Sequence, residues 1–185
     1  GRIEADAGES DRALQTLHRG LSLMRRSRAD RGAATLLIDL GWLRSYQQSY
    51  ALARTCGREA LEILNKCQDH RGLAKACHLI GWTSLCEGAY QEARAQFSSA
   101  LEHAEHTACP GIRSASSYYL ARCAYEMGAD AECRKWLGKA DELSECDPLV
   151  NATVTALVAA QAIRSHQWER AEKLLSNLAG DLKAI

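Results

Sequence analysis

The chain has 185 residues, of which 46% are hydrophobic and 25% are charged, a composition typical of folded globular proteins that excludes intrinsic disorder. Its 23 Lys and Arg residues balance 23 Asp and Glu residues, so no net charge draws this segment to nucleic acid or to an anionic membrane. No apolar run approaches the roughly 20 residues that a membrane-spanning helix needs.

Helical periodicity begins near the N-terminus and continues along the chain. Apolar residues recur at spacings of three and four, as in Leu14, Leu17 and Leu21, which is typical of amphipathic α-helices. Short breaks separate adjacent helices, at QQSY, EGAY and MGAD. Pro110 and Pro148 both follow polar segments that resemble loops. No segment has the alternation of a strand, so the sequence predicts an all-α fold.

A repeat of 40 residues underlies this pattern. The segment LGWLRSYQQSYALARTCGREAL aligns without a gap on IGWTSLCEGAYQEARAQFSSAL, so that Gly41-Trp42 falls on Gly81-Trp82. A further step reaches LARCAYEMGADAECRKWLGKAD, and a backward step places Gly8 in the slot of the turn glycine. The sequence therefore predicts a single repeat domain, 1–185, whose first unit lacks its start. Its five units span approximately 1–28, 29–68, 69–108, 109–147 and 148–185.

Small residues occupy two fixed slots in these units. The first slot holds Gly41, Gly81 and Ala121. The matching slot on the following helix holds Ala53, Ala93 and Cys133. Because small side chains let two helices approach closely, each unit is expected to be a helical hairpin. A single hairpin cannot bury its apolar face, so the units must stack to form a continuous core.

The combined motif LIG (79–81), GAY (88–90), Ala93, Phe97 and AL (100–101) resembles the tetratricopeptide repeat (TPR) family over essentially the entire chain. The resemblance implies a right-handed solenoid of about five TPR-like hairpins. The usual TPR period is about 34 residues, so units of 40 have longer helices. Such modules bind proteins, peptides or small molecules and are not enzymes.

Two segments, ADRGAATLLIDLGW (29–42) and DHRGLAKACHLIGW (69–82), resemble the long repeats of bacterial signal-responsive transcription activators, the maltose-regulon activator and its LuxR-type relatives. This resemblance implies a sensing region whose concave groove holds a small-molecule inducer or a partner protein. The alternative is a peptide-binding scaffold or adaptor in a multiprotein complex. The start, GRIEADAGES, lacks Met and favours a fragment of a larger protein.

One stripe of the predicted groove carries residue types that are common in binding sites. The first helix of each TPR hairpin lines the concave face, and residues four before or three after Trp82 share its stripe. Trp, Tyr and Arg are enriched at binding hot spots. The stripe predicts the ligand- or peptide-binding residues Trp42, Ser45, His78, Trp82, Tyr118, Arg122 and Tyr125.

Structural roles compete with these binding roles. Trp42 and Trp82 are equally well explained as core residues that pack against the adjacent repeat, because aromatics at helical spacing usually belong to a core. Arg122 is alternatively a surface cation that pairs with Glu126 one turn on. Both alternatives stay open at the level of sequence.

Neither catalysis nor metal binding is favoured. A zinc set of Cys67, His70, His106 and Cys109 at equivalent ends of successive units is conceivable, but the spacing differs from common zinc modules. Cys77-His78 cannot act as a nucleophile and base, because consecutive helical residues point about 100° apart. We therefore expect no catalytic residue, metal or cofactor.

The cysteines are spread through the helical pattern and are expected to be reduced thiols of a cytoplasmic protein, several of them in the core: Cys56, Cys67, Cys77, Cys86, Cys109, Cys123, Cys133 and Cys146.

Leu174, Leu175 and Leu178 of the last helix have no following helix to cover them. Because solenoids need capped ends, self-association or continuation of the repeats is expected there.

Overall fold

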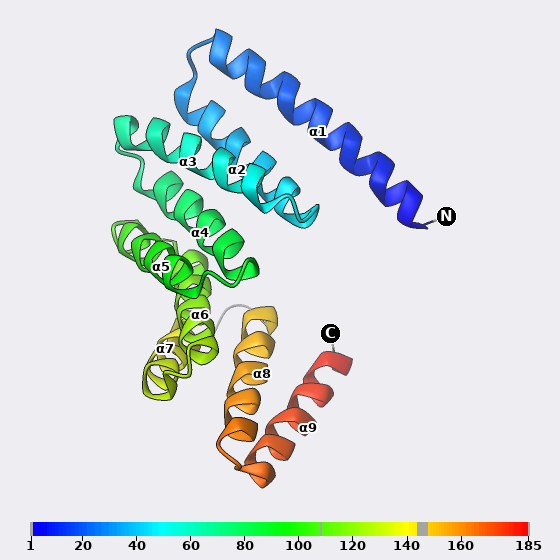
Figure 1. Ribbon diagram of the computed structural model, residues 1–185, viewed down its shortest axis with the longest axis vertical. Coiled ribbons are helices and arrows are strands. Elements are labelled where there is room, and N and C mark those ends of the chain that lie inside the picture. The colour runs from blue at the N-terminus through cyan, green and yellow to red at the C-terminus, as the bar shows by residue number, and fades with distance from the viewer. Residues whose placement is uncertain (1, 108, 144–147, 185) are drawn as a thin grey trace. The chain divides into compact units, whose positions relative to one another are not determined.

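The computed structural model describes the backbone of residues 2–107, 109–143 and 148–184, and the side chains of residues 10–107, 109–140 and 152–179. Every regular element in these ranges is an α-helix (Figure 1). The chain divides into two compact parts, Gly1–Ala108 and Cys109–Ile185, which are described separately. Each part contains more than one of the 40-residue repeats, and from here on the two parts are called the first unit and the second unit. A single domain over 1–185 stays a prediction.

The first unit contains five helices. They are α1 (Arg2–Arg26), α2 (Asp30–Tyr46), α3 (Tyr50–Cys67), α4 (His70–Cys86) and α5 (Tyr90–Glu105). Each helix packs against the next, and α2 also packs against α4 (Figure 1, blue to green). The first helices of successive hairpins are thus neighbours, which places equivalent residues of adjacent repeats side by side.

The second unit repeats this plan with two hairpins. Its helices are α6 (Pro110–Glu126), α7 (Asp130–Leu143), α8 (Pro148–Arg164) and α9 (Trp168–Ala184). Consecutive helices pack together, and α6 packs against α8 as α2 does against α4. Pro110 stands in the first turn of α6, where its missing N–H costs no intrahelical hydrogen bond.

The turn expected at Gly8 is wrong, because α1 continues through this position from Arg2 to Arg26. Glycine in a helix interior costs only about 1 kcal/mol relative to alanine, so favourable neighbours can carry a helix through it. The alignment with Gly88 therefore did not identify a turn.

The turns that do occur recur about every 20 residues, at half the sequence period. Within the described residues, six of these turns contain one residue with a positive φ, namely Arg28, Gln48, Gln68, Gly88, Gly128 and His166. At Gly88, with φ of 77°, the chain reverses and the N–H of Ala89 donates to the carbonyl oxygen of Ser84 at 2.9 Å. Equivalent bonds from Ser49 to Arg44 and from Ala129 to Ala124 end other helices in the same way.

The small-residue slots mark the closest helix approaches, as expected. Ala53, Ala93, Ala121 and Cys133 are fully buried. A Cβ atom added to Gly81 would lie 2.9 Å from Cε1 and 3.0 Å from Cδ1 of the Phe97 ring. Glycine at this position therefore lets α4 approach α5 closely enough to cover the aromatic ring.

Replacing Gly81 with alanine is expected to lower the free energy of unfolding by about 1–2 kcal/mol, since overpacking a core outweighs the better helix propensity of alanine. Gly138 of α7 is the matched control, because an added Cβ there would meet nothing within 4 Å. Gly138→Ala should raise stability by up to about 1 kcal/mol. Urea unfolding of both variants checks the pair, and equal effects would contradict the close approach at Gly81.

Cysteines contribute to both cores. Cys77 of the first unit and Cys123 and Cys133 of the second are buried. The seven cysteines within the described residues are free thiols, and Cys146 lies outside them. Sulfur in these helices therefore serves as a small apolar filler.

Candidate functional site

Four of the predicted binding residues come together in the first unit. The ring centroid of Trp42 in α2 lies 6.4 Å from that of Trp82 and 6.0 Å from that of His78, both in α4. The indole N–H of Trp82 donates to Oγ of Ser45 at 3.0 Å. Because α2 and α4 are adjacent, the 40-residue period brings the two tryptophans into contact. We name Trp42, Ser45, Tyr46, His78 and Trp82 the aromatic surface.

Neither tryptophan is fully buried or fully exposed. Trp42 packs against the core cluster that includes Ile38 and Leu73. The hydroxyl of Ser45, which is itself buried, fixes the orientation of the Trp82 indole. Packing against the adjacent repeat therefore accounts for part of each ring, while the rest of each ring reaches the surface. Their role in binding stays a prediction.

Tyr46 is a member of this surface that the sequence reasoning missed. Its side chain is 75% exposed and its ring centroid lies 6.4 Å from that of Trp42. Tyr46 is four residues after Trp42, one turn along the same helical face. The spacing of four residues from Trp42 could therefore have identified Tyr46 from the sequence.

His78, which is partly buried, lies between Trp42 and the core residue Phe97 as a neutral imidazole. Its ring meets the buried Phe97 edge-on, at 5.3 Å between centroids and 68° between planes. Burial lowers the pKa of His78 from 6.5 to about 4, because the low-dielectric surroundings disfavour the imidazolium cation. At neutral pH the aromatic surface thus has an uncharged centre.

The other three predicted residues, Tyr118, Arg122 and Tyr125, lie on α6 in the second unit. The Nε atom of Arg122 donates to Oε1 of Glu126 at 2.9 Å, which is the ion pair of the alternative explanation. The side chain of Arg122 is 45% exposed, so this pair is worth only tenths of a kcal/mol. A role for Arg122 in holding a ligand stays a prediction.

Both tyrosines are partly buried and pack against the core cluster of the second unit. The guanidinium carbon of Arg164 in α8 lies 3.2 Å from the ring centroid of Tyr125, and Nη1 of Arg164 donates to the Tyr125 carbonyl oxygen at 2.6 Å. Arg164 covers one face of this ring in a cation–π contact. The sequence stripe could not reveal it, because the arginine comes from another helix.

Histidines gather at one end of the first unit. The Nδ1 atoms of His70 and His103 are 3.2 Å apart, and the ring of His106 lies 4.9 Å from that of His70. Burial and the neighbouring His70 lower the pKa of His103. Across the described residues, no group of three or more His, Cys, Asp or Glu side chains is arranged to hold a metal ion. Cys109, the fourth member of the conceivable zinc set, belongs to the second unit.

The buried thiols are poor nucleophiles. Burial raises the pKa of Cys77 to about 11 and that of Cys133 to about 11. Each is therefore a protonated thiol at neutral pH, and only the thiolate is reactive.

The last hairpin exposes apolar side chains. Ile163, Trp168 and Leu175 are all exposed, and they line a shallow cavity with Ala171 between the end of α8 and α9. Leu174 and Leu178 are partly buried. Self-association through this face stays a prediction.

Comparison with known proteins rests on structure. No protein-family model matches the chain, and no curated protein matches it. BtubC (BKLC) from P. vanneervenii is similar with a TM-score of 0.80 and 14% identity, over 95% of this chain and 74% of that one. A Podosopora anserina kinesin light chain with nearly identical TPR-like repeats has a TM-score of 0.73 and 16% identity, over 98% and 90% of the two chains.

A third similar structure is the Rap protein complexed with Competence and Sporulation Factor. Its TM-score is 0.80 at 15% identity, over 98% of this chain and 51% of the Rap chain. No described helix is both long enough and apolar enough to cross a membrane. The predicted fold class is confirmed: the chain has the all-α fold of TPR-like helical repeat solenoids.

Proposed function

We propose that this chain is a non-catalytic scaffold that binds a protein or peptide segment, and that the aromatic surface is its binding site in the first unit. The observation that carries the proposal is the exposed Tyr46 ring beside the contacting pair Trp42 and Trp82. Tyrosine and tryptophan present a large contact area and lose little conformational entropy on binding.

The local geometry supports an apolar anchor from the partner. The Trp82 indole is already oriented by Ser45, so ordering it on binding costs little free energy. The neutral His78 adds no charge that an apolar side chain would have to desolvate. A partner that places an aromatic or aliphatic side chain against Trp42 and Tyr46 fits this surface. The three residues of α6, Tyr118, Arg122 and Tyr125, are proposed to contribute in the second unit.

Structural similarity supports a macromolecular partner. Rap was crystallised with the Competence and Sporulation Factor, and the kinesin light chain neighbour carries TPR-like repeats. We place the scaffold in the cytoplasm because its described cysteines are free.

The sensing region of a bacterial transcription activator is the second candidate. The repeat segments 29–42 and 69–82 favour it, and a small-molecule inducer would then occupy the groove. None of the structural neighbours described above is such an activator, so the scaffold is preferred. A phosphate-binding loop upstream and a helix-turn-helix downstream in the parent chain would reverse this order.

Selection from a phage-displayed random peptide library tests the scaffold. The immobilised chain should enrich peptides with aromatic or aliphatic anchors. The Trp42→Ala/Tyr46→Ala variant should bind these peptides about tenfold or more weakly, because hot-spot truncations typically cost 2 kcal/mol or more.

Leu52→Ala is the control, since Leu52 is an exposed apolar residue of α3, whereas the aromatic surface lies on α2 and α4. It should bind the selected peptides as the unmodified chain does. Circular dichroism must show that the double variant keeps its helices. Enrichment of no peptide, or equal binding by the folded double variant, would reject the aromatic surface as the binding site.

A further inference from the structure

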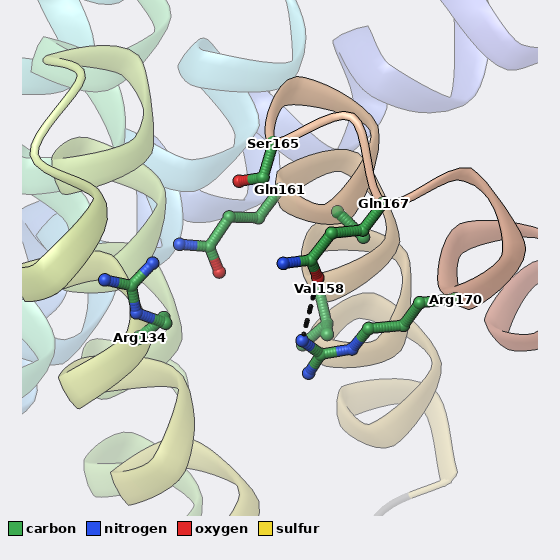
Figure 2. A pocket seen from close by; sticks show the side chains of 7 residues that line it. Arg134, Val158, Gln161, Ser165, Gln167 and Arg170 are labelled. Carbon is green, nitrogen blue, oxygen red and sulfur yellow. Dashed lines mark hydrogen bonds between the residues drawn. The ribbon is translucent and has the colours of Figure 1, made fainter.

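A polar pocket in the second unit lies between α7, α8 and the start of α9. Figure 2 shows Arg134 of α7 next to Gln161 on one side of the pocket and Arg170 next to Gln167 on the other, with Val158 and Ser165 also lining it. The cavity has a volume of about 60 Å³, room for about four or five water-sized atoms. It is built entirely from residues of the second unit.

Positive charge dominates this pocket. Arg134 and Arg170 supply two guanidinium groups, and none of the described residues that line the cavity is acidic. No described carboxylate forms an ion pair with either guanidinium. The α9 helix begins at Trp168, so its positive dipole end lies at the same site. The charges favour an anion.

The pocket is also organised by hydrogen bonds. The amide nitrogen of Gln161, which is buried, donates to the carbonyl oxygen of Asp130 at 3.1 Å. Nη1 of Arg170 donates to Oε1 of Gln167 at 3.1 Å (Figure 2). These bonds leave the remaining guanidinium N–H groups, the Gln167 amide N–H2 and the Ser165 hydroxyl as donors.

We propose that this pocket binds a phosphate group. Two guanidiniums supplied by separate helices, with neutral donors between them, match the several oxygens and the near-double negative charge of a phosphate better than the two oxygens and single charge of a carboxylate. The volume suits a phosphorus atom with four oxygens. The site is independent of the aromatic surface, which lies in the first unit, so it stands whether or not the scaffold proposal holds.

Titration of the isotopically labelled chain, followed by NMR at constant ionic strength, tests the pocket. Inorganic phosphate should shift the backbone amide signals of Ser165, Gln167 and Arg170 saturably, whereas acetate should not. Arg134→Gln and Arg170→Gln should each weaken phosphate binding about tenfold or more, because hydrogen bonds between charged groups are the strong ones. A parallel titration with N-acetyl-phosphoserine amide distinguishes a phosphorylated protein residue from free phosphate as the source.

Lys173→Gln is the matched control, because it removes one positive charge from the exposed surface of α9 outside the pocket. It should bind phosphate as the unmodified chain does. Arg134 and Arg170 are exposed, so their variants should keep the helical circular dichroism spectrum. Equal shifts with acetate, no saturable shift with phosphate, or equal weakening by Lys173→Gln would each overturn the proposal.

Discussion

Replacing Phe97 with alanine is expected to lower the free energy of unfolding by about 3–5 kcal/mol, because truncating a buried aromatic ring leaves a cavity. Phe97 is 0% exposed, and its ring contacts His78 and lies against Gly81 of α4. It therefore joins the two helices of its hairpin directly below the aromatic surface. Urea denaturation monitored by circular dichroism measures the change in unfolding free energy.

Leu52 supplies the comparison for this substitution. Its side chain is 53% exposed on α3, so Leu52→Ala should cost less than about 1 kcal/mol. A loss for Phe97→Ala as small as that for Leu52→Ala would show that the α4–α5 hairpin does not depend on the ring. Phe97→Leu should lie between the two.

Stability is expected to fall as the pH is lowered from about 6.5 to about 4, and His78 is expected to contribute to that fall. The folded chain holds the pKa of His78 at about 4, below its ordinary value of 6.5, because the imidazole is buried. The unfolded chain therefore takes up the proton first, which favours unfolding between these two pH values. Below about pH 4 both states are protonated and the loss stops growing. One proton changes stability by at most about 1.4 kcal/mol per pH unit.

His78→Gln tests this linkage because glutamine does not titrate. Unfolding free energies should be measured from about pH 7.5 to about pH 4, which covers the interval between the two pKa values of His78. They should fall less steeply for the variant than for the unmodified chain. The imidazole NMR signals of His78 should titrate near pH 4. Signals that titrate near 6.5, or identical slopes for the two proteins, would contradict a partly buried imidazole that stays neutral.

The packing of Phe97 and His78 is expected to affect binding as well as stability. Phe97 supports His78 from below, and His78 contacts Trp42 at the surface. Damage to the buried layer should therefore disturb the aromatic surface above it. Tyr46, which is exposed, offers a substitution that separates binding from folding.

Much of the helical framework follows from the sequence alone. Helices, breaks and the small residues at Gly81 and Ala93 are set by spacings of three and four residues, which are local and therefore legible in the sequence. The 40-residue period places Trp42 and Trp82 at equivalent positions, and adjacent repeats then bring equivalent positions together. The pairing of Arg122 with Glu126 is also local, since one helical turn separates them.

The positions of glycine were a poor guide to the turns. Gly8 aligned with the turn glycine, yet α1 runs through it, because one glycine costs a helix about 1 kcal/mol and neighbouring helix formers can outweigh it. The turns at Gln48 and Gln68 adopt a positive φ without glycine, since the geometry of the helix end and its hydrogen bonds compensate the strain.

The amino-acid sequence by itself thus determined the all-α repeat, the close helix approaches and the neighbouring tryptophans, because each rests on residues a few positions apart or on a fixed period. Only the tertiary structure decided how deeply each ring is buried, that Trp82 donates to Ser45, that His78 is neutral, and that Arg134 and Arg170 face one pocket. These features depend on distances between helices, and such distances are set by the packing of many side chains at once.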